Sequence, residues 1–196
     1  MSSLRVGCID LHTKIEALPF NQRMIAGCIT KPEYYLYLMM QRTIFRTMEE
    51  ISNYKDILPF KSVYRFDRIT YDIGELGCLV NTKVIGRALK KYCKTIEIAA
   101  LQEDINKMRA HVYLNYMGLA FGGSMIKSRV PGVGSMYEFD DKTALINHIR
   151  KFEEDPNDVA EMLPEVRKGF KEQIAIFKEI QYALDVASEM NNVPRV

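Results

Sequence analysis

The chain has 196 residues, a formal net charge of +2 and 47 % hydrophobic residues. This length fits one domain, and the charge balance is too even to indicate nucleic acid or an anionic membrane as a partner. The four cysteines are too far apart for a CxxC motif, which excludes zinc knuckles and thioredoxin-type redox sites. No signal peptide or membrane-spanning apolar run is recognisable, so we expect a cytoplasmic protein with one domain over residues 1–196.

Helical periodicity dominates the first half of the chain. Apolar residues recur at three- and four-residue steps over residues 3–18, which predicts one helix ending before Pro19. A short helix over residues 20–26 should follow, and a capping box at Thr30 opens a long helix to about residue 51. The stretch 52–77 has no sustained period, so we predict a loop there with one or two short helices.

The second half repeats this pattern. Helices are predicted over residues 82–98, 101–127, 142–152 and 157–190, with a Gly- and Pro-rich break at 130–135. Strand-like alternation is nearly absent. The sequence therefore predicts an all-α fold of six to eight helices in one bundle-like domain.

Three glycines, Gly118, Gly122 and Gly123, lie inside the predicted helix 101–127. Each costs about 1 kcal/mol relative to alanine, so a specific use for them is expected. Glycines on a helix admit a second helix or let a flat ligand lie against the backbone. On a regular helix, four small or polar residues fall within about 60° of one another: His111, Asn115, Gly118 and Gly122.

Polar residues also share one face of the first helix. Arg5, His12 and Glu16 lie within about 40° of one another, at the border of the apolar stripe. His12 is either a core-edge histidine paired with Glu16 or a metal ligand that a carboxylate orients. Arg5 precedes His12 by about 10 Å along the helix axis, a reasonable reach from a porphyrin iron to a propionate.

These segments, in this order and spacing, resemble heme oxygenases. Residues 11–16, with Phe20 and Gly27, are similar to the first helix of that family. Residues 111–123 resemble its distal helix, including the Gly-xxx-Gly-Gly pattern. The resemblance extends from about Leu4 to Gln181 and includes residues 48–50, the turn 134–139 and the last helix.

The resemblance implies an all-α, single-domain fold that clasps heme between the first helix and the glycine-rich distal helix. His12 is then the proximal iron ligand and Glu16 orients it. The distal residues that it implies around the porphyrin are Asn115, Gly118, Gly122 and Gly123. Those that it implies near the propionates are Arg5, Tyr113, Lys142 and Arg150. The family uses O₂ and external electrons to open the heme ring, releasing biliverdin, CO and iron.

Three positions depart from the family pattern. Leu119 stands where the family usually has an aspartate that holds water for proton delivery. Asn115 and Phe45 replace an arginine and a tyrosine of the same region. Three hypotheses stay open: Asn115, His111 or backbone carbonyls hold another water network and activity survives, the chain binds or carries heme without cleaving it, or it is a non-heme member of the fold. The retained His12 and glycine face argue against the last.

A basic stripe suggests a partner. One face of the helix predicted over 82–98 carries Lys83, Arg87, Lys90, Lys91 and Lys94. This stripe is either a solvated helix face or the docking surface for an acidic electron donor, namely a ferredoxin, flavodoxin or reductase. We expect a monomer without nucleic-acid or membrane partners.

Overall fold

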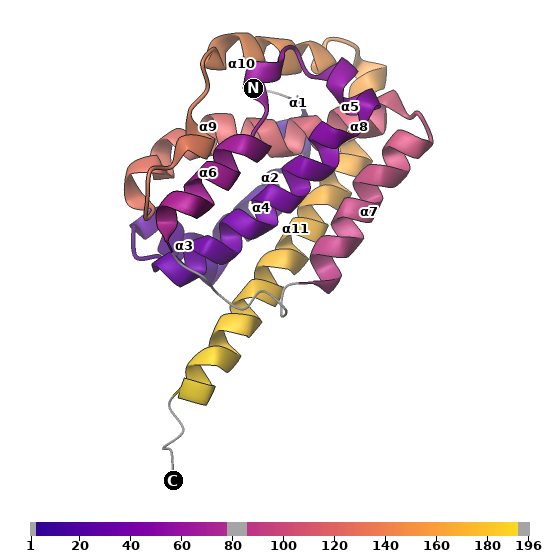
Figure 1. Ribbon diagram of the computed structural model, residues 1–196. Coiled ribbons are helices and arrows are strands. Elements are labelled where there is room, and N and C mark those ends of the chain that lie inside the picture. The colour runs from indigo at the N-terminus through magenta and orange to yellow at the C-terminus, as the bar shows by residue number, and fades with distance from the viewer. Residues whose placement is uncertain (1–2, 78–85, 192–196) are drawn as a thin grey trace.

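The computed structural model describes residues 3–77 and 86–191, with side chains up to residue 186 (Figure 1). All regular structure among these residues is helical, and it comprises α1 Ser3–Gly7, α2 Ile9–Glu16, α3 Pro19–Ala26, α4 Lys31–Glu50, α5 Ser52–Ile57, α6 Phe66–Leu76, α7 Arg87–Leu101, α8 Ile105–Val112, the π-helix Tyr113–Met117, α9 Gly118–Ile126, α10 Lys142–Arg150 and α11 Pro156–Asn191. Single 3₁₀ turns lie at Lys61–Val63, Lys127–Arg129, Ser135–Tyr137 and Lys151–Glu153. The expected all-α fold is confirmed.

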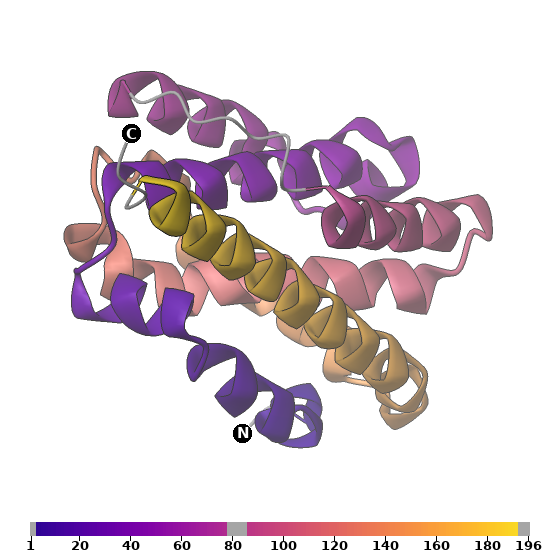
Figure 2. The ribbon, with the colours of Figure 1, turned by 90° about the horizontal axis from the view of Figure 1, so that it is seen from below.

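Two long helices organise the bundle. The helix α4 packs along α6 and α7, whereas α11 packs along α7, α8 and α2. Seen from below, α11 crosses the molecule with α1–α3 on one side and α4 and α7 on the other (Figure 2). Side chains from these helices form one hydrophobic core, in which the rings of Phe45 and Tyr116 meet edge to face at 5.1 Å. The helix α11 thus connects the first helices of the chain to the segment that contains the glycines.

Local capping fixes the elements that the sequence predicts best. Thr30 Oγ1 accepts a hydrogen bond from Glu33 N, and the Glu33 carboxylate accepts one from Thr30 N at 2.8 Å, which confirms the capping box. The helix α3 ends at Gly27, whose φ of 72° is the left-handed conformation that favours glycine.

The predicted first helix is instead two helices. It breaks at Cys8, with φ −120° and ψ 8°, between α1 and α2. Arg167 of α11 explains the break because its guanidinium donates to Gly7 O at 2.6 Å and to the Asp10 carboxylate at 2.7 Å. Cys8 is buried, and burial raises the pKa of its thiol to about 11, as expected for a packed rather than reactive cysteine. Because α1 is a separate helix, the distance estimated between Arg5 and His12 along one axis no longer applies.

The region 52–77 contains more helix than predicted. The helix α6 has 11 residues, and its buried face includes Ile69, Asp72 and Leu76. Asp72 interrupts the apolar period because its carboxylate caps a distant turn, accepting hydrogen bonds from Ser135 N and Met136 N at 2.8 Å each. The sequence pattern cannot show this partner, which is why only short helices were predicted here.

The number of helices was also underestimated. Eleven α-helices occur in the described residues, against six to eight predicted, because the predicted helices over 3–18 and 101–127 are each divided and the region 52–77 contains both α5 and α6. In the second, a turn capped by Asp104 precedes α8, and the π-helix separates α8 from α9.

A buried carboxylate joins α4 to α6. Glu49 accepts hydrogen bonds from Phe66 N at 3.0 Å and from Tyr116 OH at 2.8 Å, and burial raises its pKa. Glu49 thus caps the start of α6 and fixes the π-helix against α4.

Candidate functional site

One face of α9 is open. Gly118 is exposed, Gly122 is partly exposed, and a Cβ atom added at either would meet no other side chain or distant backbone within 4 Å. Phe121 and Met125 lie on the same side of the helix and are 48 % and 66 % exposed. An exposed apolar face of this kind, with two glycines at its centre, is a surface that a flat apolar ligand can cover.

The opposite face of α9 packs into the core. Leu119 and Ala120 are buried there, and a Cβ atom on Gly123 would lie 2.4 Å from Tyr137 Cδ1. The three glycines therefore have different roles. Gly118 and Gly122 leave one face free, whereas Gly123 lets the backbone approach Tyr137.

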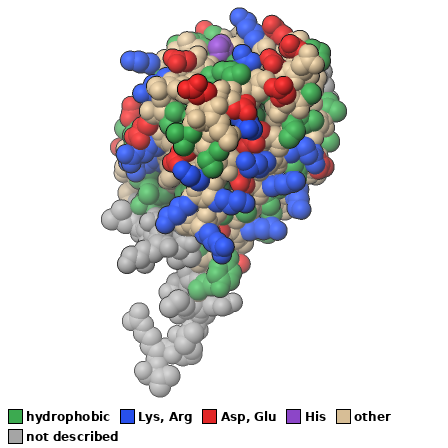
Figure 3. All heavy atoms as spheres, turned by 90° about the vertical axis from the view of Figure 1, so that its right-hand side faces the viewer, with side chains coloured by type: hydrophobic (Ala, Val, Ile, Leu, Met, Phe, Trp, Pro, Cys, Tyr) green, Lys and Arg blue, Asp and Glu red, His purple; other side chains and the backbone are tan. Residues whose placement is uncertain are grey.

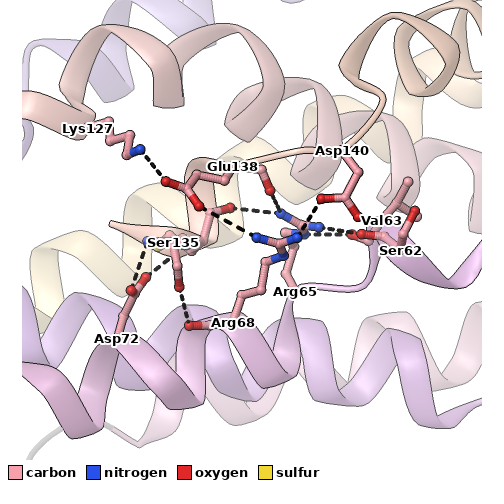
Figure 4. Close-up of polar contacts among 10 residues, drawn as sticks. Ser62, Val63, Arg65, Arg68, Asp72, Lys127, Ser135, Glu138 and Asp140 are labelled. Carbon is pink, nitrogen blue, oxygen red and sulfur yellow. Dashed lines mark hydrogen bonds and ion pairs between the residues drawn. The ribbon is translucent and has the colours of Figure 1, made fainter. Parts of the chain in front are cut away.

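A polar cluster fixes the turn that carries Tyr137 (Figure 4). Arg65 is fully buried and donates to the carbonyls of Ser62 and Val63 at 2.7 and 2.6 Å, and to that of Met136. The Glu138 carboxylate forms an ion pair with Lys127, and Arg68 forms one with Asp140 at 2.7 Å. With Asp72 at its other end, the turn is a rigid support for α9.

His12 lies on α2, and one of its two ring nitrogens faces the carboxylate of Glu16. Its Nδ1 lies 3.4 Å from Glu16 Oε1, and its ring meets Phe170 of α11 edge to face at 6.0 Å. The side chain is 41 % exposed. No residue in the described part of the chain makes a hydrogen bond to its Nε2 atom, which is therefore available to an external partner.

Side chains of α11 hold α2 in place, and α3 is tied to the end of α9. Arg167 binds Asp10 of α2, and Phe170 supports the His12 ring. At the other end, Arg129, just after α9, donates to Ile25 O of α3 at 2.6 Å. The open face of α9 and His12 thus belong to two helices whose positions are fixed through α3 and α11.

The structure does not keep the predicted four-residue face. His111 and Asn115 are 1 % and 5 % exposed and point into the core, away from Gly118 and Gly122. The π-helix Tyr113–Met117 is the cause, because each of its residues turns the chain by less than the 100° assumed for an α-helix. Residues before the π-helix are therefore rotated relative to the glycines.

Asn115 belongs to a buried polar network that the sequence did not reveal. Its Nδ2 donates to Tyr92 OH at 2.9 Å and to His111 O at 2.8 Å, and its Oδ1 accepts from Gln173 Nε2 at 3.0 Å. Burial raises the pKa of Tyr92, and the two amides oppose that rise. Tyr92 lies among the apolar residues of α7 and Gln173 lies within the long helix α11, so no local sequence pattern distinguishes either residue.

The residues that the sequence predicts to bind carboxylate groups of a ligand lie on different elements of the fold. Arg5 is exposed on α1, and Arg150 is exposed in the last turn of α10. Lys142, at the start of α10, donates to Ser124 of α9 at 2.9 Å, so it lies beside the distal helix. Tyr113 is buried in the π-helix.

The basic face predicted on α7 is present in the described residues. Arg87, Lys90, Lys91 and Lys94 are exposed, while Leu89 and Ile96 are buried; Lys83 lies outside the described residues. Figure 3 shows Lys and Arg side chains gathered on the lower part of the side of the molecule formed by α7 and α11.

The described residues contain neither a cluster of metal ligands nor a membrane-spanning helix. In residues 3–77 and 86–186, whose side chains the structure describes, no group of three or more His, Cys, Asp or Glu side chains could hold a metal ion. None of the helices in the same residues is long and apolar enough to cross a membrane.

Comparisons with known proteins agree with this geometry. Residues 1–180 match the sequence model of the heme oxygenases. The fold is similar to that of Synechocystis heme oxygenase-1 in complex with heme, with a TM-score of 0.76 and 20 % identity over 97 % of both chains. For the heme oxygenase of Leptospira interrogans the TM-score is 0.77, with 22 % identity over 90 % of this chain and 97 % of that chain.

A further similar structure is Synechocystis heme oxygenase-2 in complex with heme and NO, with a TM-score of 0.76 and 17 % identity. It is matched over 94 % of this chain and 86 % of its own length. A search of curated proteins gives no significant match. At these identities the structural likeness establishes the single-domain, all-α fold.

Proposed function

Because the matched region spans residues 1–180, the chain belongs to the heme oxygenase family, and we propose that it binds heme between α2 and α9 and opens the heme ring. The products are biliverdin, CO and iron. The observation that carries this proposal is the open apolar face of α9, where Gly118 and Gly122 leave room for a flat ligand. Heme supplies the site for O₂ and the carbon that is oxidised, and the reaction also needs external electrons.

His12 is the proposed proximal ligand. A neutral imidazole with Nδ1–H directed at the Glu16 carboxylate keeps the lone pair of Nε2 free for iron. Phe170 supports the ring from α11 and so fixes its orientation. A single exposed imidazole is sufficient for iron that a porphyrin already holds.

The residues proposed for the distal side of the heme leave space for the porphyrin but supply no acidic side chain. Gly118 and Gly122 admit the porphyrin, while Phe121 and Met125 offer apolar contacts that displace water from its face. Arg5, Lys142 and Arg150 are the basic residues proposed to pair with the two propionates.

A second function, heme binding without ring opening, is favoured by one observation. Leu119 is 6 % exposed and belongs to the hydrophobic core, so the position of the usual distal acid carries no proton donor. A heme-binding or carrier protein needs only His12 and the open face of α9. A non-heme member of the fold would need neither.

Leu119→Asp is expected to raise the bilin yield per heme. The carboxylate would replace the Leu119 side chain on the buried side of α9, next in sequence to Gly118, where it can hold water and carry protons. Burying part of it should lower the free energy of unfolding by about 1–3 kcal/mol. Leu119→Asn is the matched control without an acid; equal yields from wild type, Asn and Asp variants would contradict this expectation.

Charge reversal at Lys90 and Lys94 is expected to raise the KM for an acidic electron donor by about fivefold, the effect of a contact near 1 kcal/mol. Hemin affinity should not change, because Lys90 and Lys94 lie on the exposed face of α7, whereas the proposed heme contacts come from α2 and α9. Lys61→Glu with Lys151→Glu alters the net charge equally on other elements and should leave KM unchanged. An unchanged KM in the Lys90 and Lys94 variant would remove α7 as the docking surface.

The proposal is tested by titrating the full chain with hemin. An enzyme and a carrier both predict a stoichiometric complex with a Soret band, whereas a non-heme protein predicts none. Failure to form a saturable complex would refute the proposed function.

A further inference from the structure

Ile9 is an exposed apolar residue on the same helix as His12. It is the first residue of α2 and is 50 % exposed, whereas Leu11 and Ile15 are the buried residues of that helix. On a regular helix Ile9 lies about 60° from His12 and about 120–160° from the two buried residues. Ile9 therefore points outward, on the side of His12 that faces away from the core.

The His12 ring has a different neighbour in each direction. Phe170 of α11 meets it edge to face at 6.0 Å, and the Glu16 carboxylate lies 3.4 Å from its Nδ1 atom, one turn later in α2. Ile9 lies one turn earlier, about 4.5 Å along the helix axis. A porphyrin whose iron binds Nε2 extends farther than this from the iron, so it covers the end of α2 at which Ile9 lies.

Ile9 also belongs to the apolar surface of the proposed heme site. That site lies between α2 and α9, and the large apolar residues exposed on these two helices are Ile9, Phe121 and Met125. Phe121 and Met125 lie on the open face of α9, whereas Ile9 lies on the helix that carries His12. An exposed apolar side chain gains free energy when a ligand removes it from water. Ile9 can therefore provide on the His12 side what Phe121 and Met125 provide on the other.

We propose that Ile9 is a heme-contact residue that shields the bond between His12 and the iron from water. This inference rests on the proposed function, because it needs heme bound through His12. Contact with Ile9 slows the release of heme by burying apolar surface. It also makes the surroundings of the axial ligand less polar, which favours ferrous over ferric heme because the ferric form carries more positive charge.

The experiment compares the hemin complexes of wild type, Ile9→Ser and Ile98→Ser. Hemin transfer to excess apomyoglobin measures the dissociation rate, and a redox titration measures the ferric–ferrous midpoint potential; neither requires turnover. In Ile9→Ser we expect dissociation about three- to tenfold faster, the effect of losing the contact of half an isoleucine side chain, and a lower midpoint potential. Ile98 is the matched control, because it is 41 % exposed on α7, outside the proposed heme contacts.

Two further measurements separate contact with heme from a role in folding. Ile9→Leu keeps the apolar surface and should release hemin as slowly as wild type does. Urea unfolding of the free Ile9→Ser protein should match that of wild type, because the side chain is half exposed.

The outcomes distinguish this inference from the proposed function. If wild type binds hemin, and Ile9→Ser keeps its dissociation rate and midpoint potential or changes them no more than Ile98→Ser does, the role of Ile9 is overturned and the proposed function stands. A wild type that binds no hemin would overturn both.

Discussion

His12→Ala should lower hemin affinity by at least about a hundredfold. This loss is larger than the one that typically follows when a residue that only hydrogen-bonds to a metal ligand is removed. The ferric spectrum typical of an imidazole-ligated heme should disappear with it. The reason is that neither of the other two histidines is positioned to take over as iron ligand. His111 is 1 % exposed and lies 3.4 Å from Glu165, and His148 Nε2 is 2.7 Å from Ile57 O.

Hemin titration followed by absorption spectroscopy measures this effect. Because the His12 side chain is 41 % exposed, its removal should change the free energy of unfolding by less than about 1 kcal/mol. His148→Ala serves as the control and should bind hemin as wild type does. A His12→Ala protein that is folded and shows an unaltered ferric spectrum would mean that another residue ligates the iron.

The adjacent glycines Gly122 and Gly123 should respond in opposite ways to alanine. Gly122→Ala adds a methyl group to open space, so we expect the free protein to gain about 1 kcal/mol of stability from helix propensity. The same methyl group occupies the face on which heme should lie, so hemin affinity should fall. Gly123→Ala places a Cβ 2.4 Å from the anchored Tyr137 ring and should destabilise the protein by about 1–3 kcal/mol.

Urea unfolding of the two free proteins, with a hemin titration of Gly122→Ala, measures both effects. The pair separates a ligand-binding glycine from a packing glycine within one helix turn. A Gly122→Ala protein that is more stable and binds hemin as tightly as wild type would show that heme does not lie on this face.

Local signals accounted for much of the fold. The capping box at Thr30 and the left-handed Gly27 are decided by neighbours within a few residues, so the sequence predicted both ends of those helices. The missed features depend on distant partners. Arg167 breaks the first helix from 160 residues away, and Asp72 caps a turn 63 residues later.

The candidate site was predicted in part for the same reason. His12 with Glu16 is an i, i+4 pair, and the glycines of α9 are adjacent in sequence, so both could be found by spacing. The π-helix is a register change without a clear sequence marker, and it placed Asn115 in the core. Gln173 lies 58 residues from Asn115, and only the packing of α11 brings them together.

We propose that heme held by His12 against the open face of α9 is opened by this chain. The most direct measurement is a single-turnover reaction of the purified hemin complex with a reductant and O₂, followed by absorption spectroscopy and CO detection. We expect the Soret band to decay as a bilin band grows, with CO released in an amount equal to the heme consumed. A Soret band that persists, or bleaches without bilin and CO, would contradict it.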